Sequence, residues 1–391
     1  MTARWSAVWA VFAAGLACGA YITKVPPALP LQRAELGLTL VESGFIATTL
    51  NVMGALVGML AGVLVDRYGH KRLGLAGLAV MTAAGFAGAY SWNFASLLAA
   101  RFFEGVGFLL FTVTGGALIA NAATQPRERA KALGLWSAYM PSGGSLALLA
   151  APLVIAAWGW RGLWVALAAA AAICFLVVAK FVPAPPHGGV STLRLAMESL
   201  RNRANLVFAL LFACYVAQWS SVMIWLPTFL VEERGASPAT ASLLTALMVL
   251  VNVPGNIGGG WLLAHGARRG ALVLGASAIM ALSTTGMLAS GLPDALRYAL
   301  CLAFSMCAGV IPASIFSGIP QHARTPQHIG TANGMAIQAS QAGQFVGPIV
   351  LAWLATHLGG WGAARGALLA FAAGGALCGW AIGRIERAAP R

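Results

Sequence analysis

The stretch "GVLVDRYGHKR", residues 62–72, holds Asp66, Arg67, His70, Lys71 and Arg72 within eleven positions. Only 9% of the chain's residues are charged, whereas 59% are apolar. A soluble globular chain has about 25% charged residues. The stretch is therefore a polar turn between apolar segments, and those segments decide the fold class.

The apolar segments are long enough to cross a membrane, since a helix of about 20 apolar residues spans the hydrocarbon core of a bilayer. The sequence predicts an all-α integral membrane protein with twelve transmembrane helices. The first segment resembles a signal peptide, but many more spans follow it, and we expect a membrane helix there. The spans are expected at residues 6–29, 38–64, 73–92, 95–120, 132–157, 160–182, 205–230, 238–264, 270–290, 293–318, 330–356 and 361–384.

Lys and Arg are distributed unevenly among the connecting segments. With the N-terminus inside, seventeen of the 24 Lys and Arg residues fall on the cytoplasmic side, five on the outer side and two within spans. Cytoplasmic loops carry the excess of positive charge. We therefore expect both termini to face the cytoplasm, in a cell inner membrane. The net charge of +14 does not indicate nucleic-acid binding, because the basic residues are spread over short loops.

The longest polar segment divides the chain near its middle. Residues 183–204 begin rich in Pro and Gly and continue as an amphipathic pattern, which predicts a cytoplasmic linker with a short helix on the membrane surface. The six-helix bundles expected on either side are residues 1–182 and 205–391. Short similarities recur between them at an offset of about 200 residues, for example at Gly134 and Gly334. Two bundles related by pseudo-two-fold symmetry are typical of transporters.

In this topology the opening stretch resembles the loop between spans 2 and 3 of the major facilitator superfamily of secondary transporters. The resemblance covers essentially the whole chain, and it implies that a small solute crosses the membrane by alternating access. His70 replaces one basic position of the family's pattern. The residues that fit the pattern are Gly62, Leu64, Asp66, Arg67, Gly69, Lys71 and Arg72.

The same loop is a candidate gate. Asp66 ends span 2 on the side where span 11 begins, and a carboxylate beside an exposed helix N-terminus is stabilised by about 0.3–1 kcal/mol. We expect Asp66 to latch the cytoplasmic ends of the two halves, with Arg67, Lys71 and Arg72 orienting it. The alternative is that the loop serves only as a positively charged anchor.

Ionisable residues within the spans are few, and they are functional candidates because charge is costly to place in a membrane. Arg101 and Glu104 are three residues apart and so share one helix face. They form either an internal ion pair or an anion-binding group beside a proton carrier. Lys24 either extends to the outer interface or contributes to an anionic substrate site. Glu42, near the outer start of span 2, is a second candidate for proton coupling.

Polar and aromatic side chains recur at depths suited to a central cavity. A polar stripe facing lipid is unfavourable, so such residues either line the cavity or form hydrogen bonds between helices. The candidates for substrate binding, besides Lys24 and Arg101, are Tyr21, Asn51, Gln218, Trp219, Asn252, Gln338 and Gln341.

The sequence contains no motif of a catalytic or nucleotide-binding site, including a P-loop, and we expect no enzyme activity, cofactor or metal ion. The six cysteines lie in apolar runs and are expected to be small buried residues.

The sequence indicates a monomeric, proton-coupled transporter that takes up a small anion, because Lys24 and Arg101 are the basic residues within spans. Proton-driven efflux of drugs or metabolites is the alternative, so both symport and antiport stay open. The stretch "YMPSGGS", residues 139–145, departs in spacing from the family's exporter element, which favours uptake. A receptor or membrane enzyme without transport is a third class of function.

Overall fold

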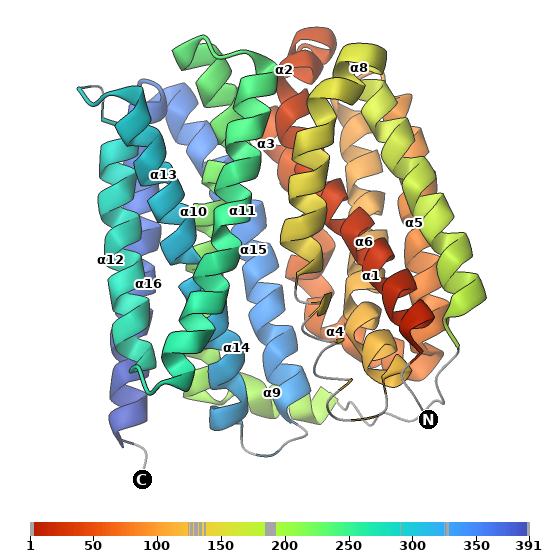
Figure 1. Ribbon diagram of the computed structural model, residues 1–391, viewed down its shortest axis with the longest axis vertical. Coiled ribbons are helices and arrows are strands. Elements are labelled where there is room, and N and C mark those ends of the chain that lie inside the picture. The colour runs from red at the N-terminus through yellow and green to blue at the C-terminus, as the bar shows by residue number, and fades with distance from the viewer. Residues whose placement is uncertain are drawn as a thin grey trace. The chain divides into compact units, whose positions relative to one another are not determined.

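The computed structural model is helical throughout the residues it describes, as Figure 1 shows. Within the described helices, the backbone alone is described at Gly62, Val63, Asp66, Arg67, residues 193–196, His328 and Ile329. The structure describes residues 4–123, 125, 128, 132, 135–136, 138–183, 193–289, 291–323, 325 and 328–388.

The helices follow the apolar segments of the sequence. In the first half they are α1 (Trp5–Thr23), α2 (Val25–Leu36), α3 (Leu40–Thr48), the 3-10 helix η1 (Thr49–Asn51), α4 (Val52–Tyr68), α5 (His70–Ala89), α6 (Phe94–Ala122) and α8 (Tyr139–Phe181). In the second half they are α9 (Leu193–Leu200), α10 (Arg203–Arg234), α11 (Pro238–Ala264), α12 (Arg269–Met287), α13 (Asp294–Ala308), α14 (Val310–His322), α15 (His328–His357) and α16 (Trp361–Ala388).

Within the described part of the chain, ten helical segments are long and apolar enough to cross a membrane. One of them, α8, is 43 residues long and changes direction at Gly159, where φ is 66°. This left-handed conformation is open to glycine without steric penalty. The two arms of α8 therefore match two of the expected spans. These segments establish a multi-pass helical membrane protein, whereas the count of twelve spans and the cytoplasmic termini stay predictions.

Two expected spans are broken in the structure. The first stops at Thr23, and α2 begins at Val25, so Lys24 stands at a junction between two helices. The span expected at residues 293–318 is divided at Gly309 into α13 and α14. Such breaks are tolerated at membrane depth when neighbouring groups bond to the freed backbone.

The helices form two compact units. Unit 1 consists of Met1–Ser191 and Leu226–Ala246, and unit 2 consists of Thr192–Trp225 and Leu247–Arg391. In unit 1, α1 packs on α8 and α5 packs on α6; in unit 2, α12 packs on α13 and α16. The division of the chain at residues 183–204 stays a prediction.

The packing of α5 on α6 depends on a pair of glycines. A Cβ atom added to Gly107 would lie 2.4 Å from the carbonyl oxygen of Gly77, and one added to Gly77 would lie 2.7 Å from the carbonyl oxygen of Gly107. Small residues let membrane helices approach this closely. The crossing fixes the position of α6, which carries Arg101 and Glu104.

A short helix follows the linker, as the amphipathic pattern predicts. This helix, α9, packs on α15, and the hydroxyl groups of Ser199 and Thr331 lie 2.6 Å apart. Its location on the membrane surface stays a prediction.

Candidate functional site

Lys24 reaches the interior of unit 1 because α1 ends immediately before it. Its backbone N–H still donates to the carbonyl of Ala20. Prolines occupy the start of α2, where backbone N–H groups have no acceptor within the helix, so the N–H that proline lacks is not missed. The Lys24 side chain has no exposed surface. The alternative that Lys24 extends to the outer interface is therefore wrong for this structure, since the side chain turns into the helix bundle instead.

The Lys24 ammonium group is held by one carboxylate and two aromatic rings. Its Nζ atom lies 2.7 Å from Oε1 of Glu104, on α6. The same atom is 4.0 Å from the ring centre of Tyr21 and 4.3 Å from that of Trp164, on α8. A desolvated cation over an aromatic face gains about 2 kcal/mol or more. Three helices therefore share the binding of one buried ammonium group.

Arg101 lies beside this ammonium group and is also fully buried. Its Nη1 atom pairs with Oε2 of Glu104 and donates to the carbonyl of Tyr21 at 3.1 Å, while Nε donates to the carbonyl of Ile46 at 3.0 Å. Ile46 is on α3. The ion pair between Arg101 and Glu104 expected from their spacing is thus present, and Glu104 bridges both cations through its two oxygens.

The cluster formed by Lys24, Arg101 and Glu104 carries two positive groups and one negative group. All three side chains have 0% exposed surface. Withdrawing an ion from water costs several kcal/mol unless it is paired and hydrogen-bonded. One carboxylate balances one cation, so with its groups ionised the cluster keeps an excess charge of about +1 at a buried position.

Two hydrogen-bond donors at the cluster have no acceptor within the described residues. They are Nη2 of Arg101 and the indole Nε1 of Trp164. A buried donor without an acceptor loses about 1–3 kcal/mol relative to a satisfied one. Excess positive charge and unsatisfied donors are both features that a bound anion with several acceptor atoms relieves.

Two other predicted residues of unit 1 lie close to helix ends. Asn51, in η1, is 1% exposed and donates to the carbonyl of Thr48 at 3.2 Å, while its own carbonyl oxygen has no partner among the described residues. Glu42 closes a capping box with Thr39 at the start of α3, with 2.8 Å between its carboxylate and the Thr39 N–H. Glu42 thus caps a helix outside the buried cluster.

The predicted polar residues of unit 2 form a network of neutral groups. Trp219 donates from Nε1 to the hydroxyl of Ser305 at 3.0 Å, and Asn252 donates to the Ser305 carbonyl at 2.9 Å. Gln218 donates to the carbonyl of Leu368 at 3.0 Å. These contacts support the alternative of hydrogen bonding between helices for these three residues.

The two glutamines predicted on the span-11 helix both lie on α15. Gln338 is half-buried, and Gln341 is 9% exposed with an amide oxygen that has no partner among the described residues. Their role in substrate binding stays a prediction.

The charged loop of residues 62–72 is described in part. Gly69 begins α5 with φ 93°, and Lys71 donates to the carbonyl of Ala179 at 2.9 Å, while Arg72 is exposed. The side chains of Asp66 and Arg67 are outside the description, as are the surroundings of Gly62, so the predicted latch is untested.

Trp164 and the Ile46 carbonyl were not predicted as parts of the site. Trp164 lies in an apolar run that also holds Trp160, and nothing in its spacing marks one tryptophan as the partner of a cation. A backbone carbonyl has no sequence signal at all. Among the described residues, no three His, Cys, Asp or Glu side chains gather as metal ligands.

A multi-pass helical bundle with ionisable groups buried at membrane depth has the make-up of a solute transporter. The chain belongs to the Major Facilitator Superfamily, because the model of that family matches residues 8–348.

Relatives in this family differ in their named substrates. The chain is 25% identical to a hexuronate transporter of Bacillus subtilis over 60% of its length and 58% of that protein. It is 26% identical to a probable sulfoacetate transporter of Cupriavidus necator over 87% of its length and 85% of that protein. A methylenomycin A resistance protein of Bacillus subtilis is 31% identical over 38% of this chain and 31% of that protein. The chain thus spans a little over half of the first relative and a third of the last.

The fold matches solved transporter structures. A bacterial homologue of the human lysosomal transporter Spinster, in an inward-facing and unoccupied conformation, superposes with a TM-score of 0.80 over 97% of both chains. The two sequences are 15% identical. This likeness concerns the fold alone.

Proposed function

We propose that the protein takes up a small organic anion by proton-coupled alternating access, as a monomer in the cell inner membrane. The observation that carries this proposal is the buried cluster in which two basic side chains, Lys24 and Arg101, share the single carboxylate of Glu104, together with the unsatisfied Arg101 donor. A substrate anion neutralises the excess charge and accepts from the free guanidinium edge.

The names of two relatives support an anionic substrate. Hexuronate carries a carboxylate, and sulfoacetate carries a carboxylate and a sulfonate. Both groups present two or more oxygens to a guanidinium group, which is planar and binds such oxyanions with paired hydrogen bonds. We therefore propose a carboxylate or sulfonate as the group that Lys24 and Arg101 bind.

Glu104 provides a route to proton coupling in this proposal. Ionised Glu104 occupies both cations through its two oxygens, and it competes with a substrate anion for them. Protonated Glu104 carries no charge, which leaves two uncompensated cations and increases the attraction for an anion. Proton binding and anion binding therefore favour each other, as symport requires. We assign this role to Glu104 rather than Glu42, which caps α3.

Proton-driven efflux is the second candidate function. The observation that favours it is the similarity to a methylenomycin A resistance protein. Efflux of an apolar compound would use Glu104 to carry the proton. It would not involve binding of the compound to the positive groups of Lys24 and Arg101. Deleting the gene and screening for new drug sensitivity separates efflux from uptake.

Uptake into proteoliposomes tests the proposal. Purified protein is given radiolabelled hexuronate or sulfoacetate, with and without an inward proton gradient, and compared with Lys24→Gln and Arg101→Gln. We expect gradient-stimulated uptake that both variants lose. The matched control is Arg161→Gln, because Arg161 pairs with the exposed Glu35 outside the cluster. Uptake that is unchanged in the Lys24 and Arg101 variants contradicts the proposed site.

A further inference from the structure

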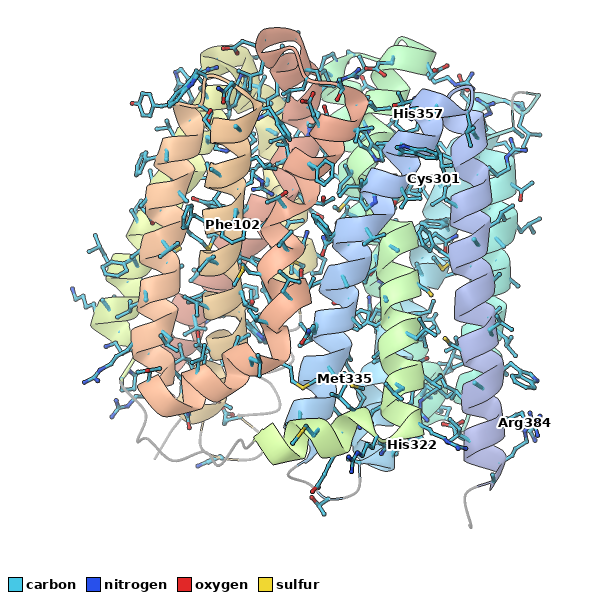
Figure 2. All side chains as sticks on the ribbon, turned by 180° about the vertical axis from the view of Figure 1, so that it is seen from behind. Phe102, Cys301, His322, Met335, His357 and Arg384 are labelled. Carbon is cyan, nitrogen blue, oxygen red and sulfur yellow. The ribbon has the colours of Figure 1, made fainter. Side chains whose placement is uncertain are left out.

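Two further arginines of unit 2 lie at the C-terminal end of α12, where Arg297 is buried and Arg365 is half-buried. Arg297 belongs to the first turn of α13, and Arg365 lies one turn into α16. Both helices pack on α12. Cys301, one turn beyond Arg297 on α13, is labelled in Figure 2. Neither arginine contributes to the cluster in unit 1.

The two guanidinium groups converge on neighbouring carbonyls just beyond α12. Arg365 donates from Nη2 to the carbonyl of Leu288 at 2.8 Å, and Arg297 donates from Nη2 to the carbonyl of Ala289. The last carbonyls of a helix lack partners within the helix and carry partial negative charge. One function of both arginines is therefore to cap α12.

Capping uses only part of their hydrogen-bonding capacity. Nε and Nη1 of Arg297, and Nε of Arg365, are buried and have no acceptor among the described residues. Arg297 is only 6% exposed. A guanidinium group has five N–H donors, and a desolvated donor without an acceptor is destabilising. The caps thus leave at least three nitrogen atoms in need of an acceptor.

The charge of this group is also unbalanced. Asp294 lies 3.5 Å from Nη1 of Arg297, but its side chain is 72% exposed and forms no hydrogen bond to that atom. Two cations therefore face one solvated carboxylate. A water molecule can accept hydrogen bonds here but cannot balance the charge.

Three glycines near the arginines in the sequence are exposed and uncrowded. A Cβ atom added to Gly362 or Gly366, which flank Arg365 on α16, would meet no atom within 4 Å. The same holds for Gly291, between α12 and Arg297.

We propose that Arg297 and Arg365 bind an oxyanion, a carboxylate, sulfonate or phosphate group, at this end of unit 2. Planar guanidinium edges bind such groups with paired, charge-assisted hydrogen bonds. The occupant is either a dissolved anion or the phosphate of a lipid headgroup, which share this chemistry. If the proposed orientation holds, the site faces outward, on the side from which an uptake transporter collects its substrate.

Binding of sulfate and of short-chain phosphatidylglycerol to the purified, delipidated protein tests this site. Dissociation constants are measured from ligand-dependent thermal stabilisation in a neutral detergent at fixed ionic strength. We expect sulfate or the lipid to stabilise the protein, and Arg365→Gln to weaken the binding by at least about tenfold through the loss of one charge-assisted contact. Stabilisation by the lipid alone assigns the site to a headgroup, and stabilisation by sulfate assigns it to a dissolved anion.

Three variants complete the design. Arg297→Lys keeps the positive charge, so the variant should fold. It replaces the two-pronged guanidinium group by a single ammonium group, so it should bind the anion more weakly. The titrations are repeated in a Lys24→Met background, which removes one cation of the proposed transport site, so that stabilisation reports binding in unit 2 and failure of the transport proposal and failure of this one are distinguishable. Arg161→Gln is the surface control.

The proposal is overturned if both ligands stabilise the Arg365 and Arg297 variants as much as the wild type, or stabilise none of them. If these variants do not fold, crystals of the wild type soaked in selenate decide the question. An anomalous peak beside Arg297 supports the site, and its absence overturns it.

Discussion

At the residue scale, Lys24, Arg101 and Glu104 place two cations and one carboxylate where none of them touches solvent. The two cations do not have equal importance for stability. Removing Lys24 leaves the neutral pair of Arg101 and Glu104, whereas removing the Glu104 charge leaves two buried cations without a counter-ion.

This asymmetry predicts an order of thermal stabilities. Glu104→Gln should lower the free energy of unfolding by about 3–5 kcal/mol, the usual effect of removing one partner from a buried ion pair. Lys24→Met should lower it by less, because methionine is similar in volume and the remaining pair is neutral. Thermal denaturation of the purified variants in detergent measures the order.

A surface ion pair serves as the control for that experiment. Glu35→Gln breaks the ion pair with Arg161. The side chain of Glu35 is 50% exposed and that of Arg161 is 37% exposed. Such pairs contribute about 0–1 kcal/mol. If Glu104→Gln proves as stable as Glu35→Gln, the three buried side chains are not charged as we describe them.

At the element scale, the crossing of α5 and α6 fixes the helix that carries two of the three cluster residues. Gly107→Ala should destabilise the protein by about 1–3 kcal/mol, because a Cβ atom there would lie 2.4 Å from the Gly77 carbonyl oxygen. The midpoint temperature of thermal denaturation and the rate of substrate uptake should both fall in this variant.

Gly116→Ala, on the same helix, is the matched control. A Cβ atom there meets its nearest neighbour, Nε1 of Trp136, at 3.5 Å, which is ordinary contact. Alanine also has the higher helix propensity, so this variant should be neutral or more stable. Equal losses in both variants would show that the close crossing is not the cause.

The last turns of α4 carry Asp66, the residue of the predicted gate. Asp66→Asn should reduce transport several-fold while leaving membrane abundance normal, because it removes a carboxylate expected to bind a helix N-terminus. Initial uptake rates normalised to immunoblot signal measure this effect. Glu233→Gln, an exposed carboxylate at the end of α10, is the control, and unchanged transport in Asp66→Asn would rule out the latch.

At the scale of the whole molecule, the distribution of Lys and Arg predicts that both termini face the cytoplasm. Alkaline phosphatase fused after residue 388 or within residues 183–192 should be inactive, and a fusion at Gly235, between α10 and α11, should be active. A fluorescent reporter that folds only in the cytoplasm should give the reverse pattern. An active phosphatase at residue 388 would refute the predicted topology.

The sequence by itself determined the class of this protein. Runs of about 20 apolar residues predict membrane helices regardless of how they pack, because the bilayer imposes the requirement on each helix separately. The charged loop at residues 62–72 pointed to the superfamily that the family model then established. The pairing of Arg101 with Glu104 was also predictable, because a spacing of three residues is a local property of one helix.

Only the tertiary structure decided what surrounds Lys24. Its partner Glu104 is 80 positions away, and the contact depends on the break after Thr23 and on the packing of α1 and α6, which no local period encodes. The aromatic ring of Trp164 and the carbonyl of Ile46 join the site for the same reason. Likewise, the sequence places Arg297 and Arg365 near the ends of two distant spans, and only the packing of α13 and α16 on α12 lets both donate to neighbouring carbonyls. The sequence specifies which residues are charged, but the packing of helices that are distant in the chain determines which charges are buried and how they pair.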